Sequence, residues 1–174
     1  MRTSSTAAIA ALLLAAGCTT TGDTREMVGT AQLMGPDGSM MGTVDLFTRG
    51  SDLMVSVDAS GLDEGAHGFH LHTTGRCDRP DFTSAGGHLN PGDNPHGRLS
   101  PGDSHLGDLP NIVAGPNGNA SATVPVSGSP SSALNYIFDA DGTAVIVHAG
   151  ADDYRSQPSG DAGSRVACGV LSRS

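Results

Sequence analysis

The stretch VGTAQLMGPDGSMMGTVDLF, residues 28–47, holds two short segments in which apolar and polar residues alternate. Residues 28–34 and 41–47 are strand candidates, because successive side chains of a strand point to opposite faces of a sheet. The tetrapeptide GPDG at residues 35–38 separates them and is typical of a hairpin turn. The stretch therefore predicts an antiparallel hairpin.

Further strand candidates follow later in the chain, at residues 53–57, 68–72, 120–126, 143–148 and 166–171. No stretch after the first residues shows a helical period, so we predict no helix. Many short strands and frequent turn signals indicate an all-β domain, built as an antiparallel sandwich or barrel. Residues 73–110 and 149–165 are too long and irregular to be turns, and long loops of this kind are usually functional.

Chain length and charge bound the possible functions. The 174 residues suit one domain once a leader is removed. Aromatic residues are only 3% and tryptophan is absent, so the core must rest on aliphatic side chains. The net charge of -9 favours solubility and argues against nucleic acid and anionic membrane surfaces as partners.

The first residues have the features of an export signal. A short apolar run, too short to span a bilayer, leads into Ala15-Ala16-Gly17-Cys18. This sequence resembles a bacterial lipobox and predicts lipidation of Cys18, although an ordinary cleaved leader is the alternative. We therefore expect an exported, periplasmic protein that contacts the membrane only through a lipid anchor. The expected divisions are a signal peptide (1–17), a tether (18–26) and one domain (27–174).

Two cysteines remain once Cys18 is assigned to lipid. In an oxidising periplasm, Cys77 and Cys168 are expected to form a disulfide. The alternative is a pair of separate buried thiols.

The histidines concentrate in and beside the two long loops. His70 and His72 form an H-x-H inside a strand candidate, so both side chains point to one face and can hold one ion. The loop that follows supplies three imidazoles and one carboxylate, a set that suits tetrahedral zinc, from His88, His96, His105 and Asp108. An ion bound there would help to order a loop without regular structure. Solvated loop histidines are the alternative.

Five motifs then make the chain resemble a known family. They are HGFHLH (67–72), AGGHLNP (85–91), SHLGDL (104–109), VHAGADD (147–153) and GSRVACGV (163–170). Together, from about residue 28 to residue 171, they resemble the copper/zinc superoxide dismutases. The resemblance implies an all-β fold, an eight-stranded antiparallel Greek-key β-barrel or sandwich with two long functional loops.

The resemblance also implies the metal ligands and their neighbours. Copper would be held by His70, His72, His88 and His148. Zinc would be held by His88, His96, His105 and Asp108, so that His88 bridges the two metals. Asp152 would link His70 to His96, with Asp153 as its competitor, whereas His67 would be structural. Cys77 and Cys168 match the disulfide of the family, and Arg165 matches its active-site arginine.

The implied reaction is the dismutation of superoxide to O₂ and H₂O₂ by redox cycling of one copper per chain. One zinc per chain would hold the bridging histidine and the metal loop. Arg165 would attract and orient the anion, and His88 would deliver a proton. A periplasmic copper or zinc carrier on the same scaffold, without turnover, is the alternative function. The sequence leaves open whether the protein is a monomer or a homodimer, and which of Arg79, Arg98 and Arg155 steer the substrate.

Overall fold

The hairpin at the start of the domain forms as predicted. The structure, a computed structural model, describes residues 24–174; the predicted signal peptide and Cys18 lie outside the described residues. Strands β1 (Arg25–Met34) and β2 (Met40–Arg49) pair antiparallel. Their turn is closed by a 2.9 Å bond from the Gly38 N–H to the Gly35 carbonyl.

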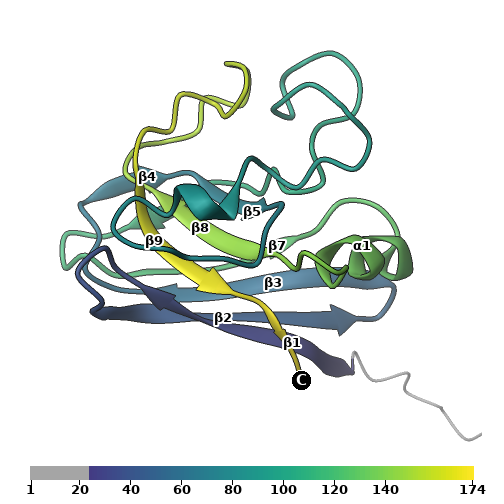
Figure 1. Cartoon of the computed structure of the whole chain (residues 1–174), viewed down its shortest axis with the longest axis horizontal. Helices are drawn as coiled ribbons and strands as arrows, with labels where there is room; N and C mark the ends of the chain where they lie inside the picture. The colour runs from purple at the N-terminus through teal and green to yellow at the C-terminus, as the bar shows by residue number, and fades with distance from the viewer. Residues whose placement is uncertain (1–23) are drawn as a thin grey trace, which may run out of the picture.

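The strands lie in two antiparallel sheets (Figure 1). The larger sheet has the order β5-β8-β9-β1-β2-β3-β7, with β10 also paired to β1, and the smaller one joins β4 to β6. The remaining strands are β3 (Asp52–Ala59), β4 (Gly65–His67), β5 (Phe69–His72), β6 (Ile112–Ala114), β7 (Ala120–Pro125), β8 (Ala144–His148), β9 (Arg165–Val170) and β10 (Ser172–Arg173). Each strand predicted from alternation is present; β4, β6 and β10, of two or three residues each, were not predicted.

The predicted fold class is confirmed. Only Gly68 separates β4 from β5, and only Leu171 separates β9 from β10. Counted as single interrupted strands, these pairs reduce the described strands to the eight of the predicted Greek-key barrel. The pairing of β3 with β7 brings together strands that are distant in sequence. The larger sheet curls into a half-barrel around the core (Figure 1).

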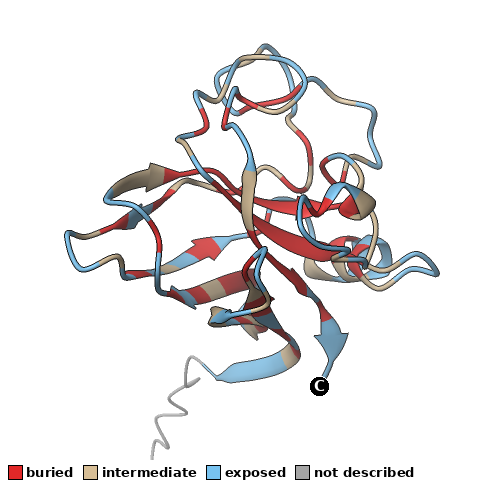
Figure 2. Cartoon of the chain, turned by 60° about the vertical axis from the view of Figure 1, so that its left-hand side comes forward, coloured by how far each residue is buried: buried red, intermediate tan, exposed pale blue. Residues whose placement is uncertain are grey.

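The core lies inside the curled sheet (Figure 2). In β1 the buried residues alternate with exposed ones, and Ala31 and Leu33 point inward. All five residues of β8 are buried, because this strand has the core on one side and the long loops on the other. Each fully buried valine or leucine contributes about 1.5–3 kcal/mol, so this aliphatic core can support the fold without tryptophan.

The prediction that the domain has no helix was wrong. Helix α1 spans Pro130–Ile137. It begins with Ser129 as N-cap and proline in its first turn, and it buries Ala133 and Ile137, four residues apart. Two turns are too short to give a clear helical period. No helix among the described residues is long and apolar enough to cross a membrane.

The two long irregular segments are confirmed as loops. The metal loop, residues 73–111, connects β5 to β6 and contains only a short 3₁₀ turn at Thr83–Ala85. The second loop, residues 149–164, connects β8 to β9 without a helix or strand. The Cys77–Cys168 disulfide is present, as predicted, and ties the metal loop to β9. Both loops are therefore anchored over the same part of the sheet.

Candidate metal centre

Strand β5 places His70 and His72 between β8 and the metal loop. On one side β5 pairs with β8, which ends at His148. On the other side Leu71 donates to the Gly107 carbonyl at 3.0 Å and accepts from the Leu89 N–H at 2.8 Å. Backbone hydrogen bonds thus hold two segments of the metal loop against β5, a contribution that the sequence did not indicate.

The first cluster consists of His70, His72, His88 and His148, all buried. His72 Nδ1 lies 2.9 Å from the Gly86 carbonyl oxygen, and His148 Nδ1 lies 3.1 Å from that of Gly163. Because a carbonyl oxygen only accepts, both Nδ1 atoms must carry the hydrogen. When these rings are neutral, Nε2 of His72 and Nε2 of His148 therefore each carry a lone pair without a hydrogen.

Four ring nitrogens of this cluster have no hydrogen-bond partner within residues 24–174. They are His70 Nδ1, His72 Nε2, His88 Nε2 and His148 Nε2. The ligand atoms of the four residues lie within 4.8 Å of one another. Leaving one buried polar atom unpaired costs about 1–3 kcal/mol, so four converging lone pairs indicate a cation site.

The protonation state of these histidines also suits a metal. Burial lowers the pKa of His70 to about 4 and that of His148 to about 3. Burial likewise lowers the pKa of His72 well below its ordinary value. At neutral pH these three rings are uncharged, which is the form that binds a metal ion.

The second cluster surrounds one oxygen of Asp108. Oδ1 lies 2.8 Å from His88 Nδ1 and 3.0 Å from both His96 Nδ1 and His105 Nδ1. Donor atoms about 2.0–2.1 Å from a tetrahedral zinc ion lie roughly 3.3 Å from one another, close to this spacing. The other oxygen, Oδ2, accepts from the Gly97 N–H at 2.7 Å, which fixes the carboxylate orientation.

His88 belongs to both clusters. Its unpartnered Nε2 faces the first cluster, and its Nδ1 faces Asp108 in the second. One imidazole can therefore bind two metal ions, one at each ring nitrogen.

Asp152 connects the two clusters through one histidine of each. Its Oδ2 lies 2.9 Å from His70 Nε2 and its Oδ1 lies 3.0 Å from His96 Nε2. The neighbouring Asp153 is exposed, and its carboxylate accepts from the N–H groups of Arg155 and Ser156 rather than from a histidine. A Cβ atom at Gly160, where φ is +70°, would lie 1.8 Å from Asp152 Oδ1, so this close approach requires glycine.

Two carboxylates hold a proton on His96. Burial opposes a charge on His96, but hydrogen bonds with Asp108 and Asp152 raise its pKa to about 9. Burial disfavours the ionised carboxylates as well, yet hydrogen bonds from the histidines lower the pKa of both aspartates. At neutral pH His96 therefore holds a proton between two carboxylates, and a bound metal ion would displace it.

Arg165 lies at the edge of the first cluster. This half-buried side chain donates from Nη1 to the Phe82 carbonyl and from Nη2 to the Gly86 carbonyl, each at 2.6 Å. The Gly86 carbonyl also accepts from His72, so only this one group separates Arg165 from the cluster. Arg165 and Asp81 line the same surface pocket.

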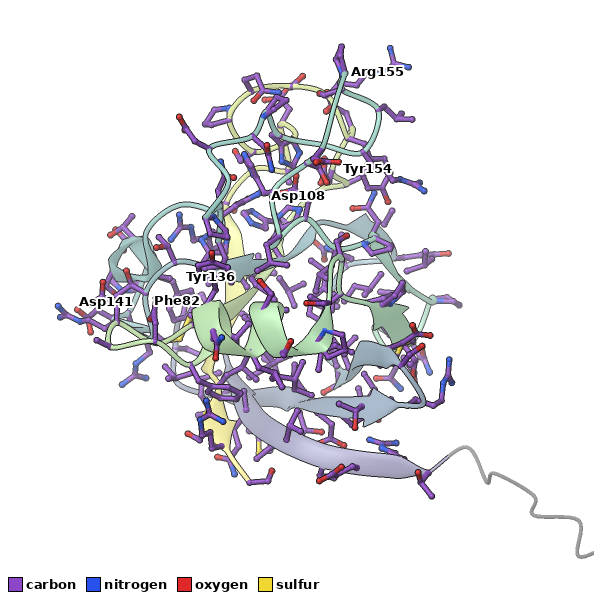
Figure 3. The ribbon with its side chains drawn as sticks, turned by 90° about the vertical axis from the view of Figure 1, so that its right-hand side faces the viewer. Phe82, Asp108, Tyr136, Asp141, Tyr154 and Arg155 are labelled. Carbon is purple, nitrogen blue, oxygen red and sulfur yellow. A yellow bond between two sulfur atoms is a disulfide. The ribbon has the colours of Figure 1, made fainter. Side chains whose placement is uncertain are left out.

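The loop arginines lie elsewhere. Arg98 stacks over the Tyr154 ring, with Cζ 4.2 Å from its centroid. Arg155 is exposed at the outer edge of the loops, beyond Asp108 and Tyr154 (Figure 3). Arg79 lies against Gly38 in the β1–β2 turn. Of these four arginines, only Arg165 shares a hydrogen-bond acceptor with a histidine of the first cluster.

His67 takes part in neither cluster. Its two ring nitrogens face the backbone carbonyls of His148 and Asp63, at 2.7 and 2.8 Å. This buried ring therefore ties β4 to the end of β8. The sequence did not reveal Gln157, Asn111 and Tyr154, whose side chains join the two loops, because their partners are backbone groups far along the chain.

Comparison with known proteins agrees with this geometry. Residues 40–171 match the sequence model of the family described as copper/zinc superoxide dismutase (SODC). The copper–zinc superoxide dismutase 1 of Aquifex aeolicus is 39% identical over 150 residues, with 84% of this chain and 89% of that protein covered.

Solved structures show the same likeness. A SOD-like protein from Bacillus subtilis has a TM-score of 0.75 at 38% identity, with 82% of this chain and 97% of that chain covered. The Cu/Zn superoxide dismutase from Brucella abortus has a TM-score of 0.67 at 31% identity, covering 82% and 98%. Since the family match extends over residues 40–171 and these relatives cover most of both chains, the chain belongs to the copper/zinc superoxide dismutase family.

Proposed function

We propose that the first cluster holds the copper ion and the second holds the zinc ion of this dismutase. The single observation that carries the assignment is the convergence of four unpartnered ring nitrogens beside a cluster of three histidines and Asp108. Imidazole nitrogens suit copper, and three nitrogens with one carboxylate oxygen suit tetrahedral zinc.

The activity is the conversion of two superoxide anions and two protons into O₂ and H₂O₂. Bound copper supplies the one-electron redox chemistry, and bound zinc supplies a fixed positive charge without redox chemistry of its own. The residues of the chain bind and orient the anion, supply a proton and keep the imidazoles in the right tautomers.

Arg165 is proposed to bind the substrate. Two of its N–H groups are committed to Phe82 and Gly86, which fixes the plane of the guanidinium. Its remaining N–H groups make no hydrogen bond within residues 24–174, so they can donate to an anion beside the first cluster. A metal carrier would not need an arginine held in this way beside the copper ligands.

His88 is proposed to carry a proton, and Asp152 is proposed to fix the tautomers of His70 and His96. Nε2 of His88 is the atom that would carry a proton to the reduced product, while Nδ1 stays directed at the second cluster. Asp152 accepts from His70 Nε2 and His96 Nε2, so the other ring nitrogen of each histidine is left to bind its metal.

The charge of the protein opposes the attraction of its substrate. The net charge of -9 repels an anion, but the Debye length is only about 8 Å at physiological salt. Charges close to the pocket therefore outweigh distant ones. Arg165 and the bound metals would provide the local positive field that draws superoxide in.

Location is part of the same proposal. The Cys77–Cys168 disulfide supports an oxidising compartment, and an exported periplasmic protein fits it. Lipidation of Cys18 and the division into signal peptide, tether and domain rest on the sequence alone.

Metal analysis combined with single substitutions tests the assignment. Protein reconstituted with both metals should hold one copper and one zinc per chain. His148→Ala should lose copper and keep zinc, whereas His105→Ala should lose zinc, because each residue belongs to only one cluster. Wild-type protein that takes up zinc alone from a medium with ample copper would overturn the copper assignment.

A further inference from the structure

Gln157, in the second loop, bonds both backbone groups of His96. Its side-chain Oε1 accepts from the His96 N–H at 2.8 Å, and its Nε2 donates to the His96 carbonyl at 3.0 Å. Nε2 also donates to the Arg155 carbonyl at 3.0 Å, which holds the amide against its own loop. The Gln157 amide thus pairs with the backbone of His96 as a residue on a neighbouring strand would.

The backbone of His96 has few other partners. In the part of the chain that the structure describes, neither its N–H nor its carbonyl bonds another backbone group. The carbonyl accepts from Ser100 Oγ at 2.5 Å as well, whereas the N–H has Gln157 as its partner. Gln157 therefore supplies two of the three hydrogen bonds made by the backbone of His96.

A second side-chain amide makes the same pair of hydrogen bonds, here from the metal loop to the backbone of the second loop. Asn111, at the end of the metal loop, donates from Nδ2 to the Asp152 carbonyl and accepts from the Asp152 N–H at Oδ1, each at 2.9 Å. Each loop thus holds the backbone of a metal-site residue in the other loop. Between the two amides lies the 3.0 Å contact of His96 Nε2 with Asp152 Oδ1.

We propose that Gln157 is a positioning residue for zinc, which sets the backbone of His96 so that its ring meets Asp152 and the zinc ligands together. The inference rests on the proposed assignment of zinc to the second cluster. Partners that orient metal ligands typically change metal affinity by about 10- to 100-fold when they are removed. Gln157 acts on the backbone rather than on the ring, so we expect about a tenfold effect.

The variants Gln157→Ala and Gln157→Glu separate this role from packing. Gln157 is exposed, so neither substitution removes a buried side chain. A glutamate can still accept from the His96 N–H, but an ionised carboxylate cannot donate to the His96 carbonyl and lies beside it. Gln32→Ala, which truncates an exposed glutamine on β1, is the matched control.

The measurement is the rate at which a chromophoric chelator removes zinc from the copper- and zinc-loaded protein. Gln157→Ala should release zinc about ten times faster than wild type, with Gln157→Glu at least as fast and Gln32→Ala unchanged. Copper content should stay at the wild-type level in all three variants. With Co²⁺ in place of zinc, only the Gln157 variants should show a changed visible spectrum.

Two outcomes would overturn the inference. One is wild-type zinc release and an unchanged Co²⁺ spectrum in Gln157→Ala. The other is an equal loss of both metals, which would make Gln157 a general staple between the loops. If wild-type protein binds no zinc, the proposed function fails and the inference with it. Normal zinc binding by wild type, with unchanged release from the variant, removes the inference alone.

Discussion

Replacing Arg165 by alanine separates an enzyme from a metal carrier. Arg165 belongs to neither cluster, and truncating this half-buried side chain opens space through which water can reach its two backbone acceptors. The variant should therefore fold and retain both metals. Superoxide consumption should fall, because the anion loses its guanidinium donor.

The size of the fall follows from the lost hydrogen bond. A hydrogen bond to a charged group contributes about 1.5–3 kcal/mol, which corresponds to roughly a 10- to 150-fold decrease in rate. Arg165→Lys should recover only part of the activity, since an ammonium group replaces the charge but cannot bond Phe82 and Gly86 while also donating in a plane to the substrate.

The assay is the decay of a superoxide pulse at several salt concentrations, with bound copper and zinc measured on the same samples. Arg25→Ala is the control, because it removes the same charge from an exposed pair with Asp45 on the β1–β2 hairpin. Wild-type activity should decrease with added salt, since local attraction is screened. Full activity in metal-replete Arg165→Ala would refute this role, and a wild-type rate that rises with salt would show that the net charge dominates.

The remaining predictions concern the pocket, the link between the clusters and the N-terminus. Asp81→Asn removes a negative charge from the pocket of Arg165 and should raise kcat/KM about twofold at low salt, an increase that vanishes near 1 M salt; unchanged kinetics at low salt would contradict this. Asp152→Asn should weaken zinc binding by about 10- to 100-fold in chelator competition, because one amide cannot accept from both His70 and His96 in the same way; wild-type affinity would count against the link. Mass spectrometry of native protein should find an acylated Cys18 at the N-terminus, whereas a free N-terminus elsewhere would reject lipidation.

Most of the strands were predictable from the sequence because the side chains of a half-buried strand alternate between apolar and polar. β4 and β6, with three residues each, are too short to show that repeat, and α1 has only two turns. Ser129 and Pro130 were the only local signs of the helix, and a cap without a visible helical period is a weak signal.

The two histidine clusters were predictable because few residue types bind copper or zinc, and the chain gathers most of these residues in one strand pattern and one loop. The choice of Asp152 over Asp153 came from family resemblance, since adjacent aspartates look alike in sequence. The structure separates them by burial. Gln157 and Asn111 could not be predicted, because a side-chain amide in a loop is common and its backbone partner is set only by the folded chain.

Copper titration of the zinc-loaded protein tests the central claim most directly. Superoxide consumption should be near zero without copper, rise in proportion to added copper and reach a plateau at one copper per chain. That result requires one redox-active site of the kind formed by His70, His72, His88 and His148. Copper that binds at one per chain without accelerating superoxide decay would contradict the account and favour a metal carrier.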